Sequence, residues 1–187
     1  MKTYNELVDL FEQANDALLM VDYGLLADQV SERTLCGALM LHIYDLIRQD
    51  PSYKGYYADV EYNRNKGSIK TIRKTIRGPD EKIISINCDL ILHSRGTHIE
   101  QDNLLAVEMK KSTRCTTEKN KDRERLIALT KDSFDDVWAW DGKNLPEHVC
   151  RYVLGVYYEI NYRRRKILVE YYRQGQKIHS YTMPFLI

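Results

Sequence analysis

The chain has 187 residues, of which 43% are apolar and 29% charged, a balance typical of one globular domain. No apolar run approaches the roughly 20 residues that span a bilayer, so we expect no membrane partner. The first ten residues lack a basic segment that leads into an apolar one, and a cytoplasmic location is therefore expected. The net charge of +1 does not by itself indicate a nucleic-acid partner.

The first part of the chain has the apolar spacing of helices. Residues Tyr4 to Met20 place their apolar side chains on one face, which predicts a first helix. A second helix is expected from Ser31, a good N-cap residue, to about Arg48. The Asp50-Pro51 pair ends it, because the residue before a proline avoids the helical region.

The rest of the chain changes to strand-like patterns, with one further helix. We expect a helix over Thr116 to Lys131, where Leu126, Ile127 and Leu129 interrupt a charged segment. The predicted strands are Tyr56 to Tyr62, Ile83 to His93, Leu104 to Met109, Tyr152 to Ile160 and Lys166 to Tyr172. This order predicts an α/β fold, with a mixed central sheet flanked by helices.

The four cysteines do not indicate a zinc site. Their spacing matches no zinc pattern and includes no Cys-x-x-Cys pair. We therefore expect no zinc and mostly buried, reduced thiols at Cys36, Cys88, Cys115 and Cys150.

Two charges end a strand that should be buried on both faces. Leu104 to Val107 is apolar, yet Glu108 and Lys110 follow it two residues apart. Side chains alternate along a strand, so these two project from one face while Met109 points the other way. The pattern predicts a carboxylate ligand beside a cation at a strand end.

A second carboxylate, Asp89, interrupts the preceding apolar strand. If that strand pairs antiparallel with the Glu108 strand, the two carboxylates lie on neighbouring strands, about 5 Å apart. Carboxylates so close repel each other unless a metal ion or a proton lies between them. A shared hard cation is the expected partner.

Asp89, followed by Glu108-Met109-Lys110 at the end of the next strand, resembles the motif of the PD-(D/E)XK nuclease superfamily. The resemblance implies a restriction-endonuclease-like fold, built from a helix, three strands, a helix and a further strand. It covers residues 28 to 172 as the core of a single domain, with residues 1 to 27 as an N-terminal helical extension. Glu32, on the core-facing side of the second helix, fits the family's upstream acidic residue.

The resemblance also implies the chemistry. Asp89, Glu108 and the backbone carbonyl of Met109 would bind Mg²⁺ or Mn²⁺, and Glu32 would orient a metal-bound water or support a second metal. Lys110 would position the attacking water and neutralise developing charge. The implied activity is endonucleolytic hydrolysis of nucleic acid, with DNA as the expected substrate.

One departure from the family pattern leaves an alternative for the first acid. The proline that usually precedes it is absent, since Asn87-Cys88 precedes Asp89. A Pro79-Asp80 pair exists, but its surroundings are typical of a turn, so Asp89 is preferred. The acid-x-lysine pairs at Asp80/Lys82 and Asp141/Lys143 also occur in turn-like sequence.

Basic residues outside this motif are candidates for phosphate binding, although solvated surface positions explain them nearly as well. They are Lys119, Lys121, Arg123, Arg125, Arg163 and Arg164. A homodimer is considered because two-fold symmetry would let both strands of a duplex be cut. The alternatives are a catalytically inactive nucleic-acid-binding module and a protein-interaction scaffold.

Overall fold

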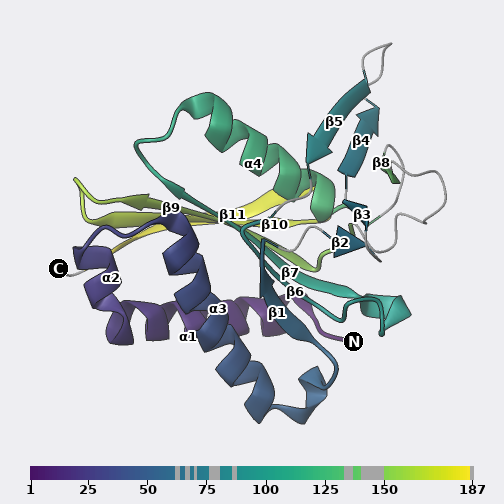
Figure 1. Cartoon of the computed structure of the whole chain (residues 1–187), viewed down its shortest axis with the longest axis horizontal. Helices are drawn as coiled ribbons and strands as arrows, with labels where there is room; N and C mark the ends of the chain where they lie inside the picture. The colour runs from purple at the N-terminus through teal and green to yellow at the C-terminus, as the bar shows by residue number, and fades with distance from the viewer. Residues whose placement is uncertain are drawn as a thin grey trace.

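A six-stranded mixed sheet forms the centre of the molecule (Figure 1). The computed structural model describes residues 1–61, 88–132 and 150–185, and the backbone of the short strands between them. In spatial order the strands are β1 (Tyr57–Val60), β6 (Leu90–His93), β7 (Asn103–Lys111), β9 (Leu154–Asn161), β10 (Lys166–Arg173) and β11 (Gln176–Pro184). All neighbours are antiparallel except β7 and β9, which are parallel because α4 connects them as a crossover.

Helices cover both faces of this sheet (Figure 1). One face carries α1 (Tyr4–Val21), α2 (Tyr23–Ala27) and α3 (Glu32–Gln49), and the other carries α4 (Thr116–Leu129). Two buried apolar clusters result, one on the α1/α3 side and one under α4. The α/β fold with a mixed sheet flanked by helices is therefore confirmed.

The predicted helices are confirmed, and so is the N-cap predicted at Ser31. The Ser31 hydroxyl accepts a hydrogen bond from the Thr34 amide at 3.1 Å and starts α3. Thr3 and Glu6 form a capping box at the start of α1. Leu7 and Phe11 of α1 are fully buried in the same cluster as the central strands, so this helix is part of the core.

The prediction of one continuous strand from Ile83 to His93 is wrong. The chain forms β5 (Glu81–Ser85), which belongs to a separate sheet, and then β6, which begins at Leu90. Asp89 consequently precedes a strand instead of lying within one. Tyr62, Asp80 and the Asp141/Lys143 pair lie outside the described residues.

Two small sheets accompany the central one. They contain β2 (Arg64–Asn65) with β3 (Ser68–Ile69), and β4 (Thr71–Thr75) between β5 and β8 (Val137–Ala139). These strands come from two insertions, between β1 and β6 and between α4 and β9. Neither they nor the edge strand β11 was predicted.

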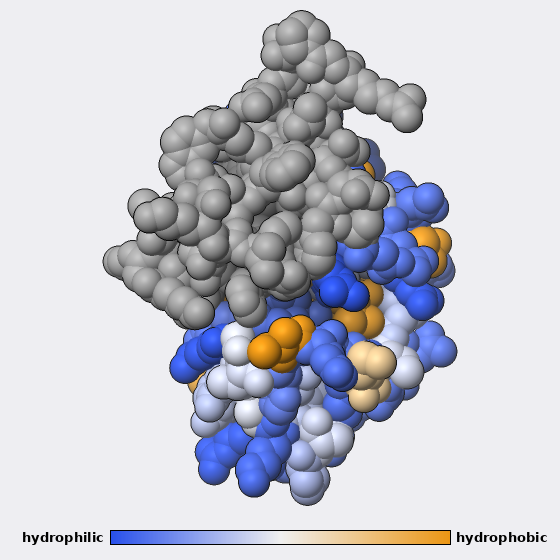
Figure 2. Space-filling view, turned by 90° about the vertical axis from the view of Figure 1, so that its right-hand side faces the viewer, coloured by the Kyte–Doolittle hydropathy of each residue, from blue (hydrophilic) through white to orange (hydrophobic). Residues whose placement is uncertain are grey.

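The surface viewed in Figure 2 is mostly hydrophilic where the structure describes it, with scattered hydrophobic residues and no broad apolar patch. Exposed large apolar side chains include Val60 and Ile99. Within the described residues, no helix combines the length and the hydrophobicity that crossing a bilayer requires.

Replacement of two glycines by alanine should change the free energy of unfolding in opposite directions. A Cβ at Gly155 of β9 would lie 2.9 Å from Thr130 Cγ2, where the end of α4 packs on the sheet, whereas a Cβ at Gly37 in α3 meets nothing within 4 Å. We expect Gly155→Ala to lower the free energy of unfolding by about 1–3 kcal/mol. Gly37→Ala should raise it by about 0.5–1 kcal/mol, because alanine favours the helix. Urea unfolding measures both, and a neutral Gly155→Ala would contradict the close packing of α4 on β9.

Candidate active site

The end of β7 places its side chains alternately on the two faces of the sheet, as predicted. Met109 packs on the α3 side, where its sulfur lies 3.8 Å from Cys36 Sγ. Glu108 and Lys110 face α4, since each contacts a residue of that helix. The sequence prediction that these two charges share one face is therefore confirmed.

Glu108 is fully buried. Its Oε1 accepts a hydrogen bond from Arg125 Nη1 at 2.5 Å, whereas its Oε2 is buried with no hydrogen-bond partner among the described residues. Burial, together with the nearby carboxylates of Asp89 and Asp122, raises the pKa of Glu108 to about 8 despite Arg125. The hydrogen bond from Arg125 thus offsets only part of the cost of burying the charged form of Glu108.

Asp89 lies across from Glu108 in the antiparallel ladder, because it precedes Leu90, the partner of Val107. The antiparallel pairing predicted for these two strands is confirmed. Asp89 Oδ2 accepts a hydrogen bond from the Met109 amide at 2.8 Å, which holds it against the neighbouring strand. Burial raises the pKa of Asp89, although this hydrogen bond and Lys110 oppose the effect.

Two residues of α4 complete the cluster, and sequence reasoning missed the role of both. Asp122 is buried, and its Oδ1 accepts a hydrogen bond from Arg125 Nη1 at 3.1 Å. Arg125 was predicted as a phosphate ligand, and Asp122 was not singled out. The helical spacing of Asp122 with Leu126 and Leu129 was the available signal, since residues four and seven apart share a helix face.

Lys110 forms an ion pair with Asp122, with 3.2 Å between Nζ and Oδ2. Although burial lowers the pKa of Lys110, Asp122, Asp89 and Glu108 raise it more, so the ammonium stays charged. Lys110 lines an open pocket of ≈ 320 Å³. The other lining residues are Glu32, Arg114, Glu118, Lys121, Asp122 and Arg125.

Glu32 reaches this pocket from the first turn of α3. Its Oε1 accepts a hydrogen bond from the Lys111 amide at 2.7 Å, and Arg114 Nε lies 3.4 Å from the same oxygen. The structure thus brings Glu32 to the end of β7, beside Lys110. It accepts a hydrogen bond from the strand backbone there, and among the described residues it forms no hydrogen bond or ion pair with Asp89 or Glu108.

The predicted phosphate-binding residues fall into two groups. Lys119 pairs with Glu159 at 3.0 Å and Arg123 with Glu170 at 2.7 Å, so both already have carboxylate partners, as Arg125 does. The second group is exposed. It consists of Lys121 at the pocket and of Arg163 and Arg164 in the turn between β9 and β10.

The carboxylate oxygens of this cluster are of the type that hard divalent cations bind. Asp89, Glu108 and Asp122 offer such oxygens beside the cations Lys110 and Arg125, and Glu108 Oε2 has no hydrogen-bond partner among the described residues. Across the described part of the chain, no three His, Cys, Asp or Glu side chains converge in a group that could hold a metal ion. The guanidinium of Arg125 lies between two of these carboxylates.

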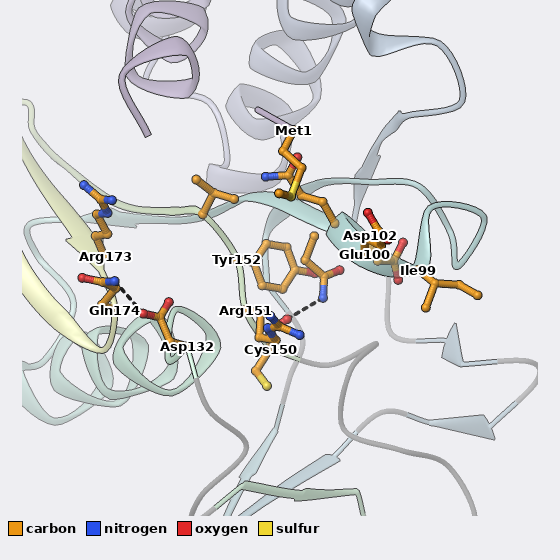
Figure 3. Close-up of a pocket in the computed structure, with 13 residues that line it drawn as sticks. Met1, Ile99, Glu100, Asp102, Asp132, Cys150, Arg151, Tyr152, Arg173 and Gln174 are labelled. Atoms are coloured by element: carbon orange, nitrogen blue, oxygen red, sulfur yellow. Dashed lines mark hydrogen bonds between the residues drawn. The ribbon is translucent and has the colours of Figure 1, made fainter. Parts of the chain in front are cut away.

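A second pocket, of ≈ 200 Å³, lies at the opposite end of the sheet, where β7 and β9 begin (Figure 3). Gln174 donates a hydrogen bond to Asp132 across it, and Asn103 donates one to the Cys150 carbonyl. Asp102 is held by Ser94 and by the Gly96 amide. These polar groups therefore serve the fold, and the pocket shares no residue with the Glu108 cluster.

Comparison of the chain with protein-family models, with curated proteins and with solved structures finds no match.

Glu108 gives a prediction on pH and stability in metal-free buffer. The folded state holds this proton up to about pH 8, whereas the ordinary pKa is 4.5, so rising pH between these values favours the unfolded chain. The contribution has a slope of up to about 1.4 kcal/mol per pH unit. Urea unfolding should show a steeper loss of stability from pH 5 to 8 in wild type than in Glu108→Gln. Parallel profiles would contradict a protonated, buried Glu108.

Proposed function

We propose that this chain is a divalent-metal-dependent endonuclease of the PD-(D/E)XK type, which hydrolyses phosphodiester bonds in nucleic acid, with DNA as the expected substrate. One observation carries the proposal. Asp89, directly before β6, lies opposite Glu108 of the antiparallel neighbour β7, with Lys110 two residues further along at the pocket. These are the residue types and the arrangement that the sequence resemblance implies.

The order of elements supports the same proposal. Helix α3, strands β1, β6 and β7, helix α4 and strand β9 follow one another, with the small strands as insertions. This order agrees with the helix, three strands, helix and strand that the sequence resemblance implies. The parallel pairing of β7 with β9 across α4 fits a mixed sheet of that kind.

Mg²⁺ or Mn²⁺, bound by Asp89, Glu108 and the Met109 carbonyl, would polarise the phosphate and lower the pKa of an attacking water. Lys110 contributes a positive charge that orients this water and stabilises negative charge on the phosphate. Asp122 holds the Lys110 ammonium in place at 3.2 Å. Glu32 fixes the end of β7 through the Lys111 amide and would support bound water.

The pocket provides cations for phosphate groups next to the cleaved bond. Arg114 and Lys121 are exposed at its rim, and both belong to the segment directly after β7. Phosphate contacts of this kind position the backbone and carry no sequence information. A homodimer with two-fold symmetry would place two such sites on the two strands of a duplex.

A nuclease-like binding module without turnover is the second candidate. The specific observation in its favour is that Arg125 already holds Glu108 at 2.5 Å while Asp122 holds Lys110. If these pairs persist in the presence of metal ions, the pocket would bind nucleic acid and leave it intact.

Cleavage of supercoiled plasmid, linear duplex, single-stranded DNA and RNA tests the proposal. We expect cleavage with Mg²⁺ or Mn²⁺, none with EDTA, and a loss of at least about 100-fold in Asp89→Ala and Lys110→Ala. Lys111→Ala is the matched control, because the Lys111 ammonium bonds the Gln29 carbonyl at 2.8 Å, and it should cut within a few-fold of wild type. Cleavage that survives both active-site substitutions would overturn the proposal.

A further inference from the structure

Arg125 lies among the groups that the proposed metal ion requires. Its Nη1 donates to Glu108 Oε1 at 2.5 Å and to Asp122 Oδ1 at 3.1 Å, so one nitrogen bridges two carboxylates. The side chain is 15% exposed and also lines the pocket. Arg125 thus contacts both the carboxylate cluster and the space open to a substrate.

The charge balance of the cluster favours either Arg125 or a divalent ion beside Glu108, and not both together. A divalent ion requires the carboxylates of Asp89, Glu108 and Asp122 in their ionised form, and Arg125 and Lys110 then leave one negative charge uncompensated. Adding a divalent ion while Arg125 stays would leave a net positive charge, whereas exchanging Arg125 for the ion makes the cluster neutral. Since unbalanced buried charge is costly, exchange is the favoured outcome.

We propose that Arg125 is the resident counter-ion of the metal-free site, that a divalent ion displaces it from Glu108, and that the released guanidinium then binds substrate phosphate in the pocket. This rests on the proposed function, because it concerns the regulation of the same site. Arg125 thereby links metal binding to nucleic-acid binding: metal loading frees the residue that binds phosphate. A guanidinium suits both positions, because it binds carboxylate and phosphate with the same donor geometry.

Calorimetry with Mn²⁺ and binding of a short fluorescent DNA duplex with Ca²⁺ replacing Mg²⁺ test the exchange. We expect Arg125→Met to bind Mn²⁺ about tenfold more tightly than wild type, because the competing cation is gone. The same variant should bind the duplex about tenfold more weakly, because the phosphate ligand is gone. A purely structural role for Arg125 would instead weaken both interactions together.

Arg123→Met is the matched control, since Arg123 lies on the same helix and pairs with Glu170, outside the cluster. It should leave Mn²⁺ affinity unchanged. Arg125→Lys, which keeps a cation, should lie between wild type and Arg125→Met. If Arg125→Met is unstable without metal, we expect Mn²⁺ to raise its melting temperature more than that of wild type.

The outcomes separate this inference from the proposed function. Equal or weaker Mn²⁺ binding by Arg125→Met, with binding by wild type, overturns the exchange and leaves the nuclease proposal standing. Tighter Mn²⁺ binding without weaker duplex binding also overturns it. Mn²⁺ binding by Arg125→Met but not by wild type shows that the ion does not displace Arg125, and this overturns the exchange together with the nuclease proposal. No Mn²⁺ binding by either protein overturns both.

Discussion

The buried carboxylate of Glu108 is the constraint on which this site depends. It stands at the end of an apolar strand, fully buried, with one oxygen bonded to Arg125 and the other without a partner among the described residues. Burying such a charge is costly unless it is paired, so the helix above it must carry a cation on its inner face. The unusual composition of α4 follows: its sheet-facing side holds Asp122 and Arg125 among the leucines.

The need to pair buried carboxylates also explains why α4 has fewer exposed cations than its basic sequence indicates. Lys119 and Arg123 turn toward Glu159 and Glu170 of β9 and β10, and the Arg123 guanidinium also lies 4.0 Å from the centre of the Tyr157 ring. Half-buried ion pairs of this kind fix α4 on the sheet. Lys121, in contrast, is exposed at the pocket.

The sequence predicted the central architecture because its periodicities are strong and local. The helices, the strand around Glu108 and the last two predicted strands follow from such patterns. The break between β5 and β6 did not, because an isoleucine-rich run has the same pattern whether it forms one strand or two in different sheets. Among site residues, Glu108 and Lys110 could be found from strand alternation, whereas Asp89 was found as a carboxylate in an apolar run and lies just before β6. Asp122 could have been found from its helical spacing with Leu126 and Leu129, which are buried on the same face of α4.

Folding without metal adds a physical reason for the chain to carry its own counter-ions. Three carboxylates brought together between β6, β7 and α4 would repel one another in a metal-free protein and oppose docking of α4. Lys110 and Arg125 reduce this repulsion through contacts at 3.2 Å and 2.5 Å, so the sheet and helix can assemble before any metal ion binds. The compensation is incomplete, as the raised pKa of Glu108 indicates. The divalent ion that we propose would supply the positive charge that Lys110 and Arg125 do not.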